Sequence, residues 1–458
     1  MKTGAAISRR EFLRTACTAV GTAALANTVF DLSRMAAASS LYRFNPGDYK
    51  ALVCVFLYGG NDGNNTIVPT GTLDYGDYAA ARGALALPRA SLLPIAPLHS
   101  DGRSWGLHPS LSGIRNLFAQ RHAAILANVG PLVAPVTRDD YLMGSAALPP
   151  QLFSHSDQTV HWMTALPDRP ALSGWGGRTA DLLRNLNANA QISMSISVAG
   201  TNTFQVGNQV TQYQVSTEGA MGLDYYQTGP FADPSSRAIK SLIETPYSNL
   251  LERAYAGIKK RAIDNGEMLG AALDATPPLA TEFPDTDLGR QLRMVARLIG
   301  ARSPLEQQRQ IFFVATGGYD THGDQLAPQA SLLAELDQSL SAFYQATVEM
   351  GVAPQVTSFT ASDFGRTYTA NVDGSDHGWG GHHFILGGAV QGGDIYGAMP
   401  TLAIEGPDDT EQGRWIPTTS VDEYSATLAK WFGVAPGNLT DVFPNLGRFA
   451  RPDLGFLG

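Results

Sequence analysis

The chain has 458 residues, of which 44% are hydrophobic and only 16% are charged, so it is long enough for one large α/β domain or two ordinary ones. Its formal net charge of −9 makes nucleic acids and anionic membranes poor candidate partners, because both would repel an acidic surface. The residues suited to chemistry run from Asp62 to His383, near both ends of the chain. This spread favours one elaborated domain over residues 39–458.

Residues 1–38 have the pattern of a twin-arginine export signal. They contain the pair Arg9 and Arg10, a mildly apolar stretch, and a run of small residues that ends at Ala38. A disordered basic tail or a membrane anchor is the alternative interpretation. We expect the twin-arginine export machinery to recognise this segment, and we expect the folded protein to be periplasmic or secreted.

The rest of the chain offers no segment of 18 or more consecutive apolar residues, so we expect no stable membrane insertion. The two cysteines are Cys17, inside the proposed signal, and Cys54, inside the first apolar run. The mature chain therefore cannot form an internal disulfide and must be held together by its core.

Short, continuous apolar runs predict the strands of a parallel sheet covered on both faces. Apolar stripes over 288–298 and 332–343 predict helices, and the second lies between two strands, as in a right-handed crossover unit. We expect an α/β fold with a doubly wound, mostly parallel sheet sandwiched by helices. Residues 70–110 and 200–240 lack a steady period, and we interpret them as loop insertions at the mouth of a crevice. The predicted strands are 51–58, 123–129, 192–198, 311–316, 356–360 and 384–390.

A glycine-rich turn with Asn61, Asp62 and Asn64 follows the first predicted strand. Glycine lets the backbone approach a ligand closely, while Asp62 supplies an anionic metal ligand and Asn61 or Asn64 a neutral one. The turn lacks the phosphate-loop and dinucleotide-binding fingerprints, so nucleotide binding has no support. Asp62 is therefore a candidate metal ligand.

Ser154, His155 and Ser156 precede a predicted helix that runs through Met163. A hydroxyl at a helix N-terminus is well placed as a nucleophile, because the helix dipole favours the developing anion. The simpler interpretation is that one of the two serines is the N-cap of the helix. We treat all three as candidate catalytic residues.

Asp320 and His322 lie in a glycine-flanked loop beyond another predicted strand, where a carboxylate and an imidazole can converge on one metal ion. A polar turn that caps the next helix is the alternative. Asp363, Arg366 and His377 follow the next predicted strand and add a carboxylate, a guanidinium and an imidazole at the same edge of the sheet. The fork of Arg366 can bind an oxyanion bidentately, or it can form a structural salt bridge with Asp363.

Together these motifs resemble the twin-arginine-exported family called domain of unknown function 1501, which is similar to the alkaline phosphatase and sulfatase superfamily. The resemblance implies an alkaline phosphatase-like fold that holds one or two divalent metal ions (Zn, Mn, Ca or Mg). It implies Asp320, His322 and His377 as the ligands of one metal. Asp62 and Asp363 would be the ligands of the other. The segments that carry the resemblance are 59–63, 154–155, 318–322, 363–367 and 376–383.

The same resemblance implies that Arg366 clamps the nonbridging oxygens of a small-molecule or polymer ester. Our leading hypothesis is therefore an exported, metal-dependent hydrolase of phosphate or sulfate esters. One departure weakens the second metal site: Phe364 stands where superfamily hydrolases often have a histidine. The rival hypothesis is a non-catalytic, exported binding or assembly protein that retains the alkaline phosphatase-like fold.

Overall fold

The computed structural model describes residues 48–220, 226 and 232–458. The proposed twin-arginine signal therefore lies outside the described residues. Within the described part of the chain, no helix is both long enough and apolar enough to span a bilayer.

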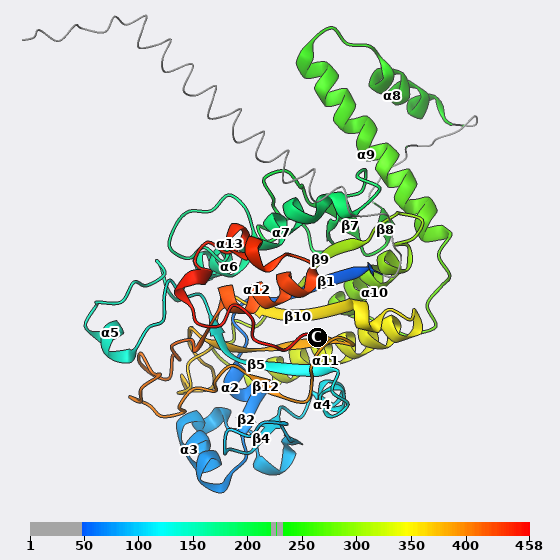
Figure 1. Cartoon of the computed structure of the whole chain (residues 1–458). Helices are drawn as coiled ribbons and strands as arrows, with labels where there is room; N and C mark the ends of the chain where they lie inside the picture. The colour runs from blue at the N-terminus through cyan, green and yellow to red at the C-terminus, as the bar shows by residue number, and fades with distance from the viewer. Residues whose placement is uncertain (1–47, 221–225, 227–231) are drawn as a thin grey trace, which may run out of the picture.

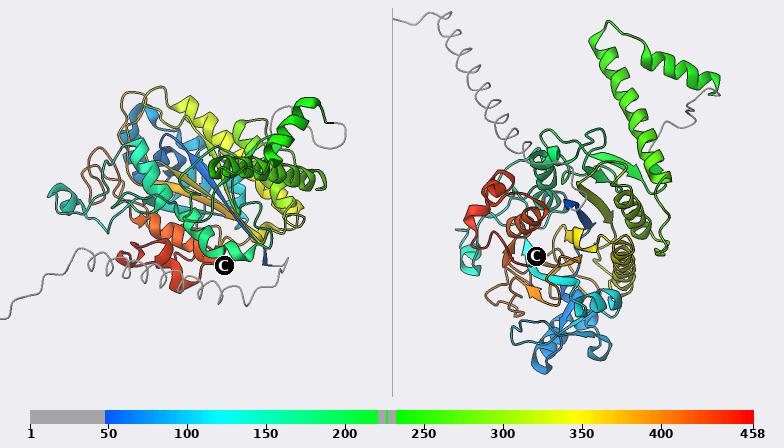
Figure 2. Two further views of the ribbon diagram at one scale, coloured as in Figure 1. Left: turned by 90° about the horizontal axis from the view of Figure 1, so that it is seen from above. Right: turned by 45° about the vertical axis from the view of Figure 1, so that its right-hand side comes forward.

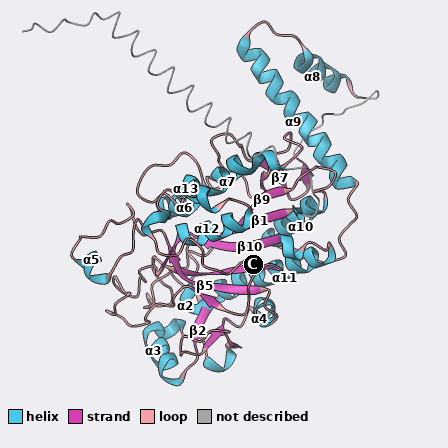
Figure 3. Cartoon of the chain, in the orientation of Figure 1, coloured by secondary structure: helices cyan, strands magenta, loops and turns pink. Residues whose placement is uncertain are grey.

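A ten-stranded sheet forms the centre of the fold (Figure 1 and Figure 3). Its middle strand is β1 (Lys50–Leu57), which pairs in parallel with β10 (Val356–Ser362) on one side and with β9 (Arg309–Thr316) on the other. β6 (Ser195–Ser197) and β7 (Tyr213–Ser216) continue the parallel order beyond β9. The apolar runs thus form the mostly parallel sheet that the sequence predicts.

β11 (Gly381–Gly387) runs antiparallel to both of its neighbours, β10 and β5 (Ala123–Gly130). The connection from β10 to β11 is the loop 363–380, which stays at the carboxyl end of β10. A strand that follows such a return loop must run backwards, because a parallel strand needs a crossover to the opposite edge. The remaining short strands of this sheet are β8 (Gly219–Ala220), β12 (Ile395–Tyr396) and β13 (Thr419–Ser420).

Helices cover both faces of the sheet, so the molecule has three layers. Successive residues of β1 point to opposite faces, with Val53 and Val55 in one core cluster and Leu52 and Cys54 in the other. The first face is covered by α4 (Ser112–Ala119), α9 (Leu250–Asp274), α10 (Asp287–Gly300) and α11 (Leu326–Glu349). The second is covered by α6 (His155–Thr164), α7 (Trp175–Leu183), α12 (Val421–Phe432) and α13 (Leu439–Val442).

The insertion over residues 70–110 is more regular than its composition predicts. It contains α3 (Thr72–Arg82) and contributes two strands to a small second sheet of order β2-β4-β3, which has its own apolar cluster. Its elements are too short for a period to show in the sequence. The other elements here are α2 (Gly63–Thr66), β2 (Ile67–Pro69), β3 (Leu93–Ile95) and β4 (Trp105–Leu107).

Two further helices contribute to neither of the two core clusters of the main sheet. α5 (Arg138–Leu142) precedes the segment that carries His155, and α8 (Pro234–Glu244) forms a hairpin with α9. The hairpin projects from the sandwich, and two further views show the same projection (Figure 1 and Figure 2).

Candidate metal centre

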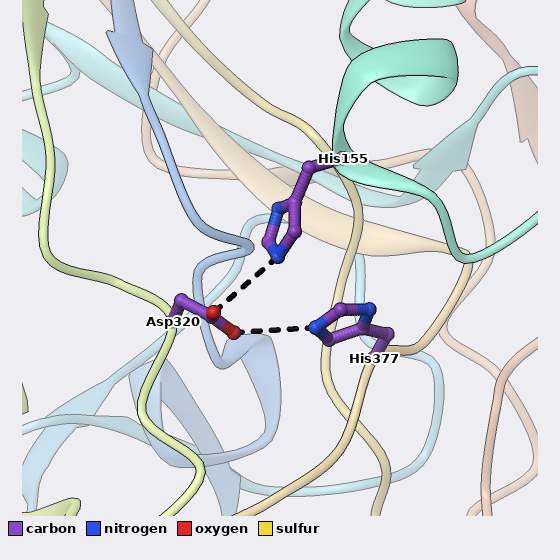
Figure 4. Close-up of side chains that lie close together, drawn as sticks. All are labelled: His155, Asp320 and His377. Carbon is purple, nitrogen blue, oxygen red and sulfur yellow. Dashed lines mark hydrogen bonds and ion pairs between the residues drawn. The ribbon is translucent and has the colours of Figure 1, made fainter.

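The loops of the site leave one edge of the sheet side by side. The last residues of β1, β9 and β10 are in register, and the loops that follow these strands contain Asp62, Asp320 and Asp363 respectively. His155 reaches the same edge from the first turn of α6, and His377 reaches it from the loop 363–380 (Figure 4). This arrangement follows the rule that α/β sheets bind ligands beyond the carboxyl ends of their strands.

Three imidazole nitrogens converge on the carboxylate of Asp320. The Nε2 atoms of His322 and His377 lie 2.9 and 3.2 Å from its Oδ1, and Nε2 of His155 lies 3.4 Å from its Oδ2. The Nε2 atoms of His322 and His377 are 2.9 Å apart. The ligand atoms of His155, Asp320 and His377 all lie within 4.8 Å of one another, and Nε2 of His322 adds a fourth donor beside Asp320 and His377. Imidazole nitrogens and a carboxylate are donors that a divalent transition metal accepts.

The other nitrogen of each imidazole is held by a group that can only accept a hydrogen bond. Nδ1 of His155 lies 2.7 Å from the Asp363 carboxylate, and Nδ1 of His377 lies 2.7 Å from the carbonyl oxygen of Phe153. Nδ1 of His322 lies 3.2 Å from the Asp376 carboxylate. Each Nδ1 must therefore carry the proton, which leaves the Nε2 lone pair for a cation, as in known metal-binding histidines.

Two observations at the Nε2 atoms agree with this assignment. Nε2 of His155 is buried and makes no hydrogen bond within the described part of the chain. Burial lowers the pKa of His377, so its neutral form is favoured at neutral pH, and this is the form that binds metals. Between nitrogen atoms as close as those of His322 and His377, either a shared proton or a metal cation must offset the repulsion of two lone pairs.

Arg366 forms an ion pair with Asp320. Its guanidinium is fully buried and donates to Asp320 Oδ1 at 2.8 Å, to the carbonyl oxygen of Gly59 at 3.2 Å and to both oxygens of Ser375. Burial raises the pKa of Asp320, but hydrogen bonding and charge attraction from Arg366 outweigh this, and the net pKa is below the ordinary value. Arg366 therefore keeps Asp320 ionised, and its ion-pair partner is Asp320 and not Asp363, the salt-bridge partner considered from the sequence.

Phe364, the residue that departs from the superfamily pattern, packs against two of the histidines. Its ring centroid lies 4.6 Å from that of His377, nearly stacked, and 4.7 Å from that of His155. The phenyl ring therefore forms an apolar wall that fixes both imidazole planes.

Asp363 supports the cluster through His155. It also accepts a hydrogen bond from the backbone N–H of Gly59 at 3.1 Å, and burial raises its pKa. Asp376 has the corresponding role for His322 and accepts a further hydrogen bond from Asn371 at 2.9 Å. We predicted Asp363 as a ligand and assigned no role to Asp376, although its position directly before His377 was a usable signal.

Asp62 is not brought into this cluster. Its carboxylate is buried, forms an ion pair with Arg82 of α3, and accepts hydrogen bonds from Gln325 and from the backbone N–H of Asn64. Asp62 also caps the short helix α2. These partners occupy the oxygens that the proposed second metal would need.

Ser154 is the N-cap of α6: its hydroxyl oxygen accepts from the backbone N–H of Asp157, and its hydroxyl lies 2.5 Å from the carboxylate of the same residue. Ser156 is exposed and hydrogen-bonds to Asp157 at 3.2 Å. Ser156 also lines an open, shallow pocket of about 430 Å³ beside the histidines. Its other lining residues are Tyr58, Gly59, His155, Thr159 and Asp363.

A model of the family described as "Protein of unknown function (DUF1501)" matches residues 49–441. Among solved structures the chain is similar to Ps i-CgsB, with 11% identity and a TM-score of 0.35 over 88% of this chain and 77% of that one. It is also similar to the PsFucS1 sulfatase from Pseudoalteromonas sp., with 10% identity and a TM-score of 0.33 over 89% and 72% of the two chains.

A mutant of the alkaline phosphatase PafA aligns over 70% of this chain and 63% of that one, with 12% identity and a TM-score of 0.23. No curated protein matches the chain. Because all three TM-scores are below 0.5, the functional conclusion must come from the geometry of the site.

Proposed function

This chain belongs to the family described as protein of unknown function (DUF1501), and we propose that it is an exported, metal-dependent hydrolase of phosphate or sulfate esters. One observation carries the proposal: the Nε2 atoms of His155, His322 and His377 converge on Asp320 while each Nδ1 is held by an acceptor. Such second contacts orient metal-binding imidazoles and fix their tautomer.

The types of donor atom indicate which metal the site prefers. Imidazole suits zinc and other transition metals, whereas calcium and magnesium prefer sets made of oxygen atoms. With three nitrogen donors and one carboxylate in His155, His322, His377 and Asp320, we propose one zinc or manganese ion. A divalent cation bound there would lower the pKa of a bound water molecule and polarise an ester oxygen.

The pocket beside the histidines supports an ester substrate. It is open and shallow, which suits a terminal phosphate or sulfate group on a larger molecule. Tyr58 offers an aromatic surface, and Ser156 and Thr159 offer hydroxyls at its wall. Ser156 is the better candidate for a nucleophile of the two predicted serines, because Ser154 is engaged in capping α6.

Metal analysis and turnover test the proposal together. Protein purified without a chelating tag should contain about one equivalent of zinc or manganese, because the described residues contain one donor set of this kind. It should hydrolyse at least one of three generic substrates, an aryl phosphate, a phosphodiester or an aryl sulfate. His377→Ala and Asp320→Ala should lose the metal and at least 100-fold in kcat/KM, about the effect of removing an electrostatic catalytic group.

His99→Ala is the matched control, because His99 also contacts a carboxylate, that of Asp394, but its ring is exposed and outside the cluster. It should keep wild-type metal content and activity. A folded, metal-free wild type, or equal activity in wild type and His377→Ala, would contradict the proposal.

The second candidate is a non-catalytic, exported binding or assembly protein with one structural metal. It is favoured by the serine hydroxyls, which are hydrogen-bonded to Asp157, and by the buried guanidinium of Arg366, which is engaged with protein groups. Full metal occupancy without turnover of any of the three substrate classes would favour this candidate.

A further inference from the structure

The N-terminal half of α9 exposes an apolar stripe. Leu251, Tyr255 and Ile258 are 78%, 64% and 56% exposed, and their spacing of four and three places them on one face of the helix. Leu250, at the start of the helix, is 67% exposed. A contiguous exposed apolar face of this kind marks an interaction surface.

The other end of α9 is anchored in the core. Leu269, Ala272 and Leu273 are buried in the cluster that contains α10 and α11. With a rise of 1.5 Å per residue, the stripe lies about 20 Å along the helix from this anchor. In two views the N-terminal half of α9 projects away from the sandwich (Figure 1 and Figure 2). The stripe can therefore contact an external surface without contact between that surface and the sandwich.

The partner helix α8 leaves the stripe uncovered. The groove between the two helices is lined from α9 by residues on a different side of the helix, namely Lys260, Ile263, Asp264 and Glu267. Ala256, next to Tyr255 in sequence, is buried, whereas the Tyr255 ring is exposed. The stripe is thus a face that the described part of the chain does not use for packing.

The charge around the stripe is opposite to that of the whole chain. Lys259 and Arg261 border the stripe, with Glu252 as the one acid of residues 250–261, whereas Lys260 lies on the other side of the helix and pairs with Asp264 at 2.9 Å. The chain as a whole has a formal net charge of −9. The Lys259 ammonium lies 5.5 Å from the Tyr255 ring centroid, at the border of the stripe. Leucine, isoleucine and tyrosine flanked by basic side chains are typical of a helix that lies in a membrane interface.

We propose that α9 docks the protein on an anionic lipid surface. Leu251, Tyr255 and Ile258 enter the headgroup region, and Lys259 and Arg261 pair with lipid phosphates. A second copy of the chain paired along the same stripe is the other possible occupant, and the experiment below separates the two. The acidic net charge, which led us to disfavour anionic membranes, hides this local basic segment.

Vesicle binding by the full chain tests the proposal. Wild-type protein should co-sediment with phosphatidylcholine vesicles that contain about one third phosphatidylglycerol, and this binding should weaken as salt is raised. Ile258→Asp should weaken it about tenfold or more, because the change removes buried apolar area and adds a repelled charge. The matched control is Leu172→Asp, since Leu172 is 95% exposed and precedes α7 in the layer on the opposite face of the sheet.

The basic N-terminal residues 1–38 are present in all three proteins, so a difference among them reports on α9. Equal binding by wild type and Ile258→Asp would overturn the proposal. Equal binding to vesicles made only of phosphatidylcholine would also overturn it. A dimer seen by light scattering without vesicles, and lost in Ile258→Asp, would overturn it in favour of self-association.

Discussion

At the scale of single residues, the contacts of Asp62 indicate that it stabilises the fold. Its carboxylate and the Arg82 guanidinium are both buried, so removing one charge leaves the other unpaired in the interior. Asp62→Asn should therefore lower the free energy of unfolding by about 3–5 kcal/mol, measured by urea denaturation. The metal content of the folded fraction should be unchanged. If Asp62→Asn instead lost the metal and kept the wild-type stability, Asp62 would be a metal ligand.

Asp320 and His322 directly follow a recognisable strand, and the family resemblance added His377 to them. The structure brings the three side chains together. The sequence did not predict the role of His155, which depends on the direction of its ring: Nδ1 points to Asp363 and Nε2 points to Asp320. The partner of Asp62 was also beyond prediction. Arg82 lies in a helix whose stretch of sequence shows no steady period.

At the scale of elements, the central strands were predictable, because residues buried on both faces form unbroken apolar runs. The direction of β11 was not, since it depends on the path of the loop 363–380. α9 was missed because only four of its residues are buried, namely Ala256, Leu269, Ala272 and Leu273, and these do not make a continuous apolar stripe in the sequence.

The first turn of α12 contains a buried acid whose protonation should make stability depend on pH. Both carboxylate oxygens of Asp422 lack a hydrogen-bond partner among the described residues, and burial raises its pKa from 3.8 to about 8. Between these two values the native state holds a proton that the unfolded state has lost. The contribution of protonated Asp422 to the free energy of unfolding is fully present below pH 4 and is lost as pH rises toward 8.

Asp422→Asn should remove this pH dependence, because the amide resembles the protonated acid and does not titrate. Between pH 4 and 8, the free energy of unfolding of the variant should exceed that of the wild type by up to a few kcal/mol, since one pKa unit corresponds to about 1.4 kcal/mol. Urea denaturation at a series of pH values measures the difference. Asp274→Asn, at the exposed C-terminal end of α9, is the control and should follow the wild-type profile.

At the scale of the whole molecule, the sandwich joins segments that are remote in sequence. The proposed metal site takes residues from the start of α6, from the loop after β9 and from the loop 363–380. A ligand that binds only this assembled site stabilises the native state by RT ln(1 + [L]/Kd). Zinc or manganese at one hundred times its Kd should therefore raise the free energy of unfolding by about 2.7 kcal/mol.

Thermal or urea unfolding with and without a chelator measures this gain. His322→Ala should abolish it, because one of the three converging nitrogen atoms is lost. Asp363→Asn should keep the gain but require about 10- to 100-fold more metal, because Asp363 acts on the site through His155. A gain in His322→Ala equal to that in the wild type would place the metal elsewhere in the chain, since stabilisation by this site requires the four donor groups to be brought together by folding.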